Sequence, residues 1–135
     1  MGCGPRAQGG AHRPRHPLLI DHLRECQITL EVCPTSNVCT RAVTSLGEHP
    51  IRRLYDAGVP ITVNSDDPPM FGTTLLDEQL LLAKKFGFTI DDIETINIQG
   101  IRSAFLPESD QHRLEAEFRD EYSRLRQELG LTSSD

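Results

Sequence analysis

Two adjacent carboxylates carry the strongest chemical signal in the sequence. Asp66 and Asp67 stand in the run Asn-Ser-Asp-Asp-Pro at 64–68, directly after a short apolar stretch that is typical of a β-strand. At the carboxyl end of a strand, one carboxylate could bind a divalent metal ion and the other could hold a substrate. The alternative is structural, because Asp before Pro initiates turns and Asn, Ser and Asp cap helices. A turn alone does not explain two acids, two prolines, Met70 and Phe71 in succession.

Histidines give weaker signals. His49 precedes Pro50 at a predicted junction between a loop and a helix, which favours a capping or packing role over chemistry. The sequence reveals no partner for His22 or His112.

The four cysteines are Cys3, Cys26, Cys33 and Cys39. They include no Cys-x-x-Cys pair, and the interval between Cys33 and Cys39 matches no common zinc pattern. We therefore expect free thiols and no catalytic Cys-His pair.

A parallel β-α-β unit is the arrangement that would position the two carboxylates. Runs rich in β-formers at 28–32 and 59–64 predict two strands, and the segment 49–57 between them has Pro50 at its start and Gly58 after its end, as helices do. This spacing is typical of parallel strands joined by a right-handed helical crossover. One edge of the strand pair should then collect four side chains: Glu31, Cys33, Asp66 and Asp67.

Helices are predicted over most of the remaining chain, at 17–25, 74–86, 89–105 and after Pro107. The helix at 89–105 begins with a capping box, and residues 35–47, rich in Ser, Thr and Asn, are predicted to form a loop. The last helix carries one apolar stripe, formed by Leu114, Phe118, Tyr122, Leu125 and Leu129. Because two parallel strands do not make a stable sheet alone, the sequence predicts a piece of an α/β fold.

Composition and charge exclude several classes of protein. The chain has 135 residues, 37% of them hydrophobic, and a net charge of −6. Its longest apolar run, 80–83, is far shorter than the roughly 18 residues of a membrane-spanning helix. The acidic balance argues against nucleic-acid binding, for which Arg6, Arg13 and Arg15 offer only a few positive charges. A small-molecule substrate is expected instead.

The first sixteen residues differ from the rest. Residues 1–16 hold four Gly, two Pro, three Arg and no acid, so we expect a disordered segment followed by a domain at 17–135. The segment has no apolar core of the kind that secretory signals need, which predicts a cytoplasmic protein. A truncated or frame-altered N-terminus would explain this composition, and the upstream reading frame would settle that hypothesis.

The sequence resembles the C-terminal part of the adenosine and adenine deaminases. Four segments carry the resemblance in the family's order and spacing: EVCPTSN at 31–37, HP at 49–50, NSDDPPMFGTTL at 64–75 and SAFL at 103–106. It covers about residues 17–125. The family's fold is a (β/α)8 barrel of typically ~250 residues. The resemblance therefore implies the C-terminal portion of a TIM-type barrel, with two parallel strands and closing helices, incomplete as a barrel.

The resemblance also implies roles for the two aspartates. Asp66 would be the acidic ligand of a Zn2+ ion, and Asp67 would hydrogen-bond the purine ring. The family's other zinc ligands, a His-x-His pair and the His of His-Ala-Gly-Glu, are absent from the chain, as is the Glu of that motif. A further family histidine lies in Gly-His-Gly, but the expected place here holds Gly9 and Gly10, and His12 nearby has Ala and Arg as neighbours.

By this resemblance the parent function is zinc-dependent hydrolytic removal of the C6 amino group as ammonia. The substrate would be a purine nucleoside or base, with adenosine, adenine and a modified adenosine all open. Lacking most metal ligands, the chain is expected to be a truncated form that is inactive alone. The alternative is a non-catalytic interaction module, whose exposed strand edges are buried against a partner or by self-association.

Overall fold

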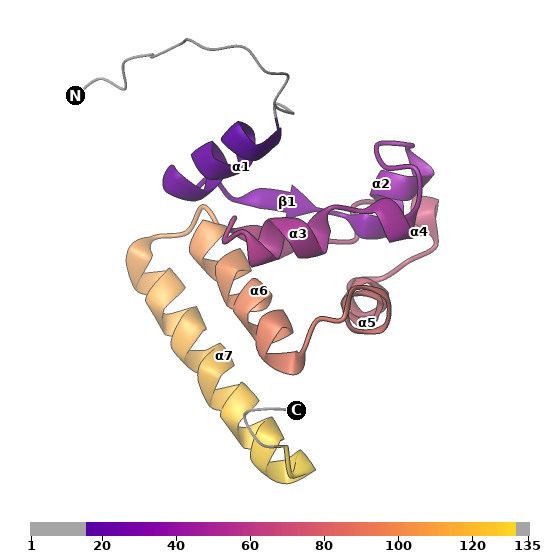
Figure 1. The fold of residues 1–135 in the computed structure, drawn as a ribbon. Coiled ribbons are helices and arrows are strands. Elements are labelled where there is room, and N and C mark those ends of the chain that lie inside the picture. Colours follow the sequence, from indigo (N-terminus) through magenta and orange to yellow (C-terminus); the bar gives the residue numbers. More distant parts are fainter. Residues whose placement is uncertain (1–15, 132–135) are drawn as a thin grey trace, which may run out of the picture.

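The computed structural model describes residues 16–131 as helices packed around a two-stranded sheet (Figure 1). Residues 1–15, which hold His12 and nearly all of the predicted disordered segment, lie outside the described part, and His16 already belongs to the first helix. In chain order the elements are α1 (His16–Glu25), β1 (Leu30–Val32), α2 (Pro34–Cys39), η1 (Leu46–Glu48), α3 (Ile51–Asp56), β2 (Ile61–Val63), α4 (Pro68–Phe71), α5 (Leu75–Phe86), α6 (Ile90–Ser103) and α7 (Glu108–Leu129).

The two strands pair in parallel, as the sequence predicts. Leu30 faces Ile61 and Val32 faces Val63, and α3 lies in the connection between the strands. The ladder continues beyond the strand ends, because the Asn64 amide donates to the Val32 carbonyl at 3.0 Å. Both strands therefore deliver the residues that follow them to the same end of the sheet, the end toward which the β1 arrow points in Figure 1.

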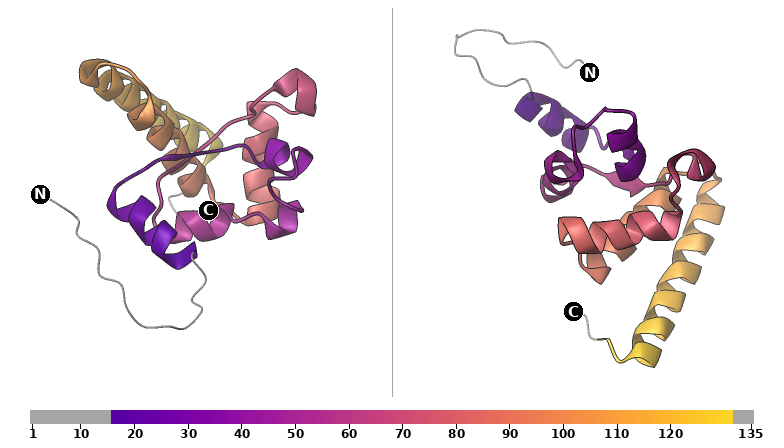
Figure 2. Two further views of the ribbon diagram at one scale, coloured as in Figure 1. Left: turned by 90° about the horizontal axis from the view of Figure 1, so that it is seen from above. Right: turned by 90° about the vertical axis from the view of Figure 1, so that its right-hand side faces the viewer.

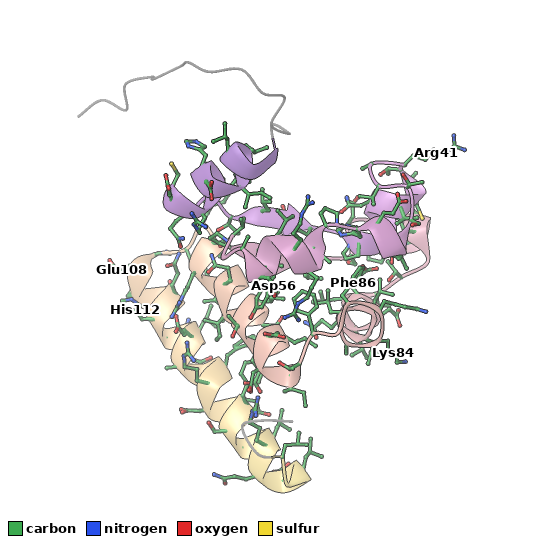
Figure 3. All side chains as sticks on the ribbon, viewed as in Figure 1. Arg41, Asp56, Lys84, Phe86, Glu108 and His112 are labelled. Carbon is green, nitrogen blue, oxygen red and sulfur yellow. The ribbon has the colours of Figure 1, made fainter. Side chains whose placement is uncertain are left out.

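The core lies where the strands meet α3, α5 and α6. Ile51 and Leu82 are fully buried, Ile61 is 2% exposed, and α6 packs along β2. The buried apolar cluster comprises Val32, Ile51, Val59, Ile61, Val63, Leu82, Phe88 and Ile96. Figure 3 shows Phe86 at the end of α5, next to α3, where it packs against this cluster. This core fixes the strands and α5, which are the elements around the candidate site.

Local signals set the limits of the long helices. Thr74 and Thr89 begin α5 and α6 with reciprocal capping boxes, each Thr accepting from the amide of an Asp three residues later, so the predicted box at 89 is confirmed. The predicted end of α6 is wrong by two residues. Ala104 is extended with ψ 147°, and the Phe105 side chain is fully exposed.

The predicted loop at 35–47 is also partly wrong. Pro34 begins α2, because proline at the first helical position fixes φ and its missing N–H has no helical partner to lose. Thr40 follows the last residue of α2, and its hydroxyl donates to the Ser36 carbonyl at 2.8 Å, which gives that carbonyl a partner at the helix end. The short helix α4 is an element that the sequence did not predict, although it indicated Asp as a possible cap of a following helix.

The last two helices form a hairpin that extends from the core. In Figure 1, α7 runs back along α6, and Figure 2 shows its C-terminal half lying away from the sheet. The predicted stripe on α7 faces α6 in part: the Tyr122 hydroxyl accepts from Asn97 of α6 at 3.1 Å, whereas Leu129 is 68% exposed. Within the described residues, no helix is long and apolar enough to cross a membrane.

Candidate functional site

A hollow opens at the carboxyl ends of the two strands. It has a volume of about 510 Å³ and is lined by Glu31, Cys33, Asn37, Asn64, Ser65, Asp66 and Leu75. The predicted gathering of residues at one edge is therefore confirmed for Glu31, Cys33 and Asp66. Asp67 follows at the start of α4, beside the hollow but outside its lining. The right-hand view of Figure 2 faces this end of the sheet, with α2 and α4 toward the viewer.

Asp66 has an unusual backbone and a partly engaged side chain. Its φ of 59° lies in the left-handed region, which non-glycine residues rarely occupy and which is frequent at functional sites. Its Oδ2 accepts from the buried Ser36 hydroxyl at 2.7 Å. No described residue hydrogen-bonds Oδ1, so one carboxylate oxygen stays open at an exposed position that lines the hollow.

Asp67 uses one of its oxygens to start α4. Oδ1 accepts from the Met70 amide at 3.0 Å, which makes Asp67 the N-cap of a helix with prolines at its first positions. The capping role that the sequence offered as an alternative is therefore real for this residue. It does not exhaust the carboxylate, because its second oxygen has no partner among the described residues and the side chain is exposed.

Cys33 lines the hollow as a protonated thiol. Burial raises its pKa, and the carboxylates of Asp66, Glu31 and Glu78 raise it further, while a backbone hydrogen bond with Asp66 opposes these effects. Since the thiolate is the nucleophile, a raised pKa disfavours nucleophilic chemistry at Cys33.

Glu78 is a buried residue at the site that sequence reasoning missed. This residue of α5 is 1% exposed, and both of its oxygens accept hydrogen bonds: Oε2 from the Thr35 amide at 3.1 Å and Oε1 from the Thr73 hydroxyl at 2.7 Å. Glu is rarely buried, and it stands here in the polar-looking run Leu-Asp-Glu-Gln at 76–79. One of its two donors, the Thr35 amide, lies 43 residues away, so no local pattern reveals that this carboxylate is buried.

His49 has a structural environment. Its ring is 8% exposed, Nδ1 accepts from the Ile51 amide at 3.2 Å, and Nε2 pairs with Asn37 Oδ1 at 3.1 Å. Since Asn37 Oδ1 only accepts, Nε2 carries the proton. The ring meets Phe86 edge-on at 5.7 Å. Burial lowers the pKa of His49, although the Glu78 charge opposes the shift. These contacts are of the capping and packing kind that the sequence predicts.

His22 and His112 do have neighbours, contrary to the reading from sequence. His22 Nδ1 lies 3.5 Å from the Cys26 thiol on the exposed side of α1. His112 Nε2 lies 3.9 Å from Glu108 Oε1 one turn away, and both side chains project from the outer side of α7 in Figure 3. Neither pair lines the hollow, and in each pair the two residues are four positions apart in the chain, about one helical turn.

Among the described residues at the hollow, Asp66 is suited to be one ligand of a metal ion. Within residues 16–131, no group of three or more His, Cys, Asp and Glu side chains is arranged to hold a metal ion. Asp66 offers an open carboxylate oxygen whose partner oxygen is fixed by Ser36, which suits a zinc ligand supported by a second hydrogen-bonded residue. Catalytic zinc sites use about three protein ligands, so a complete site would need ligands from beyond these residues.

Comparisons with known proteins show which family this chain resembles. A family model described as adenosine deaminase matches residues 5–121, starting inside the segment predicted to be disordered. Aminodeoxyfutalosine deaminase of Streptomyces coelicolor is 47% identical over 97 residues, which are 72% of this chain and 25% of that protein. The chain spans between a quarter and about a third of the length of the relatives it matches.

Two solved structures share the fold. Adenine deaminase from Arthrobacter aurescens superposes with a TM-score of 0.73 at 33% identity, covering 78% of this chain and 32% of that one. An amidohydrolase from Burkholderia ambifaria with bound Zn gives a TM-score of 0.75 at 27% identity, covering 85% of this chain and 32% of that one. The α/β fold seen here, with its parallel strand pair and closing helices, is therefore part of a TIM-type barrel, as predicted.

Proposed function

The chain belongs to the adenosine deaminase family, and we propose that it carries part of a zinc-dependent purine deaminase site, with Asp66 as a zinc ligand and Asp67 as a purine-binding residue. The observation that carries the proposal is the strand pair itself. It holds the Asp-Asp pair at the mouth of a hollow, with one oxygen of each carboxylate open.

Asp66 is suited to hold the metal. The Ser36 hydroxyl donates to Oδ2 and so restrains the carboxylate, and Asp66 lines the hollow. Zinc in such sites lowers the pKa of water, so that water becomes a nucleophile at neutral pH. The solved relative with bound Zn supports this choice of metal.

Asp67 is suited to hold the substrate. Its Oδ1 is committed to the Met70 amide, which fixes the carboxylate at the start of α4 and leaves the second oxygen as a hydrogen-bond acceptor toward solvent. A purine ring nitrogen that carries a proton would be a matching donor. We therefore assign the metal to Asp66, whose carboxylate is held by the Ser36 hydroxyl, and the purine to Asp67, whose carboxylate is held by the Met70 amide.

The site would be completed by the remainder of a barrel. The chain matches about a quarter to a third of its relatives, and the described residues supply one metal ligand where about three are needed. We therefore propose that the 135-residue chain alone retains no zinc and has no deaminase activity. The relatives named for aminodeoxyfutalosine and adenine support a purine base or nucleoside as the proposed substrate class.

Complementation tests this proposal. The chain is mixed with a separately produced N-terminal part of the Streptomyces relative that ends where this chain's match begins, and ammonia release is measured with adenosine, adenine and aminodeoxyfutalosine. The mixture should release ammonia from at least one of them, and neither part alone should do so. Deamination by the isolated chain, or none by a mixture shown to associate, would contradict the proposal.

A second candidate function is an interaction module without catalysis. Within the described residues each strand pairs on one side only, and several apolar side chains are exposed, including Leu18 at 72% and Leu76 at 65%. Unpaired edges and apolar patches favour association. Light scattering coupled to size-exclusion chromatography separates the two functions. A stable self-associated form that does not bind the complementary N-terminal part of the relative would favour the interaction module.

A further inference from the structure

Among residues 16–131, Glu78 is the one Asp, Glu, Lys or Arg side chain that the fold buries, and it lies next to the candidate site. It is 1% exposed, and within residues 16–131 no Lys, Arg or His forms an ion pair with it. A buried carboxylate without a cation is costly unless its oxygens receive hydrogen bonds. Its neighbour Leu82, one turn along α5, is fully buried, so the helix places Glu78 on its core-facing side.

The two hydrogen bonds to Glu78 come from two chain segments that hold the aspartates: one follows β1, and the other contains the aspartates themselves. Thr35 follows β1 and directly precedes Ser36, whose hydroxyl holds Asp66. Thr73 follows the short helix that Asp67 caps, and it reaches the other oxygen of Glu78. One carboxylate on α5 therefore ties the segment that orients Asp66 to the segment that begins at Asp67.

We propose that Glu78 is a positioning residue for both aspartates. The inference rests on the proposed function and deepens it: Glu78 touches neither metal nor substrate, and instead fixes the 33–37 and 65–74 segments relative to each other. The Thr35 N–H needs a hydrogen-bond acceptor, and the Glu78 carboxylate provides one. The same carboxylate accepts from the hydroxyl of Thr73, which lies 38 residues from Thr35 in the chain. A buried apolar residue at this place would fill the space and release both segments.

Three variants separate positioning from core packing. Glu78→Leu keeps the volume apolar and removes both acceptors. Glu78→Gln keeps an oxygen for the Thr35 amide, and its amide group can donate to Thr73, whose hydroxyl has the Thr74 carbonyl at 3.4 Å as another acceptor. Thr73→Val removes one donor only. Asp77→Asn is the matched control, because Asp77 lies next to Glu78 on α5 but bonds only Thr74.

Amide hydrogen exchange on the full 135-residue chain is the first measurement. Glu78→Leu should speed exchange at least tenfold in both segments together, while exchange in α6 changes less than threefold. Glu78→Gln should stay within about threefold of wild type, Thr73→Val should affect mainly 65–74, and Asp77→Asn should leave 33–37 unchanged. Equal acceleration throughout the molecule, or none in either segment, would overturn the proposal. If Glu78→Leu does not fold, Thr73→Val decides: it should speed exchange at 65–74 beyond the change that Asp77→Asn causes through Thr74, and an equal or smaller change would overturn the proposal.

The complemented barrel gives the second measurement and keeps the two proposals apart. There Glu78→Leu should weaken zinc retention and lower kcat at least tenfold, and Glu78→Gln should restore most of both. If exchange responds as expected but Asp66→Ala retains zinc, the proposed function fails and the tie through Glu78 stands. If exchange does not respond while Asp66→Ala loses zinc, the function stands and the positioning role fails.

Discussion

The strand ends and the surface between α6 and α7 both hold many polar side chains, but they use them differently. At the strand ends, buried polar groups such as Ser36 and Glu78 each bond one or two named partners. Between α6 and α7, charged side chains at the surface pair in networks: the half-buried Glu115 accepts from the exposed Arg102 and Arg119, each at 2.8 Å. Buried bonds are costly to break, whereas exposed ion pairs contribute little. Changes of equal chemistry should therefore cost more at the strand ends.

The largest difference is expected from apolar truncation. Leu82→Ala, beneath the candidate site, leaves a cavity at a fully buried position and should lower the free energy of unfolding by about 3 kcal/mol. Leu125→Ala on α7, where the side chain is 37% exposed, should cost about 1 kcal/mol or less. Urea denaturation of both variants measures the contrast. Equal losses would mean that α7 is packed as firmly as the core.

A hydroxyl deletion should give the next largest contrast. Ser36→Ala removes the buried donor to Asp66 and leaves Oδ2 without it, at an expected cost of about 1–2 kcal/mol. Ser123→Ala removes an exposed hydroxyl that donates to a carbonyl within α7 and should change stability by less than about 0.5 kcal/mol. The same denaturation experiment compares them, and a costlier Ser123→Ala would break the comparison.

His49 should make stability depend on pH near neutrality. Burial lowers its pKa below the usual 6.5, so the unfolded chain binds the proton more readily than the folded one. The free energy of unfolding then has its full contribution from neutral His49 above about pH 6.5. This contribution is lost as the pH falls from 6.5 toward the lower pKa of the folded state, and the Glu78 charge makes the loss smaller. His49→Asn should flatten this part of a thermal stability profile, while the exposed His112→Asn should not. An unchanged slope in His49→Asn would refute the assignment.

The smallest expected effect comes from the charge network on α7. Hydrogen bonds from Arg102 and Arg119 lower the pKa of Glu115 from 4.5 to about 2. This pairing stabilises the fold fully above about pH 4.5, and the contribution is lost as the pH falls toward 2. Glu115→Gln should remove about 0.5 kcal/mol at neutral pH and reduce acid sensitivity between pH 5 and 2. A larger loss than for Ser36→Ala would reverse the comparison.

Much of the framework follows from local sequence. The strand pair, the crossover helix and the capping box at Thr89 were predictable because short runs of β-formers, Pro and Gly at helix ends, and cap residues act over a few positions. The edge shared by Cys33 and Asp66 followed from the same reasoning, since parallel strands end together. The family resemblance added the identity of the barrel.

What could not be predicted depends on contacts between distant residues. The segment at 35–47 reads as a loop from its Ser, Thr and Asn content, yet Pro34 and the buried Ser36 hold α2 in place against the site. Glu78 reads as a surface carboxylate until Thr35, 43 residues away, supplies an amide to it. Propensities cannot report such partners because they exist only after the chain has folded.

Bound zinc in the complemented barrel tests the central claim most directly. Metal content after dialysis is compared for wild type, Asp66→Ala and Asp67→Ala, with ammonia release recorded on the same samples. Asp66→Ala should lose the zinc, whereas Asp67→Ala should keep it and lose turnover at least a hundredfold, because each aspartate has a separate role at the strand ends. Equal zinc content in all three proteins, or equal loss in both variants, would contradict the assignment of metal to Asp66 and substrate to Asp67.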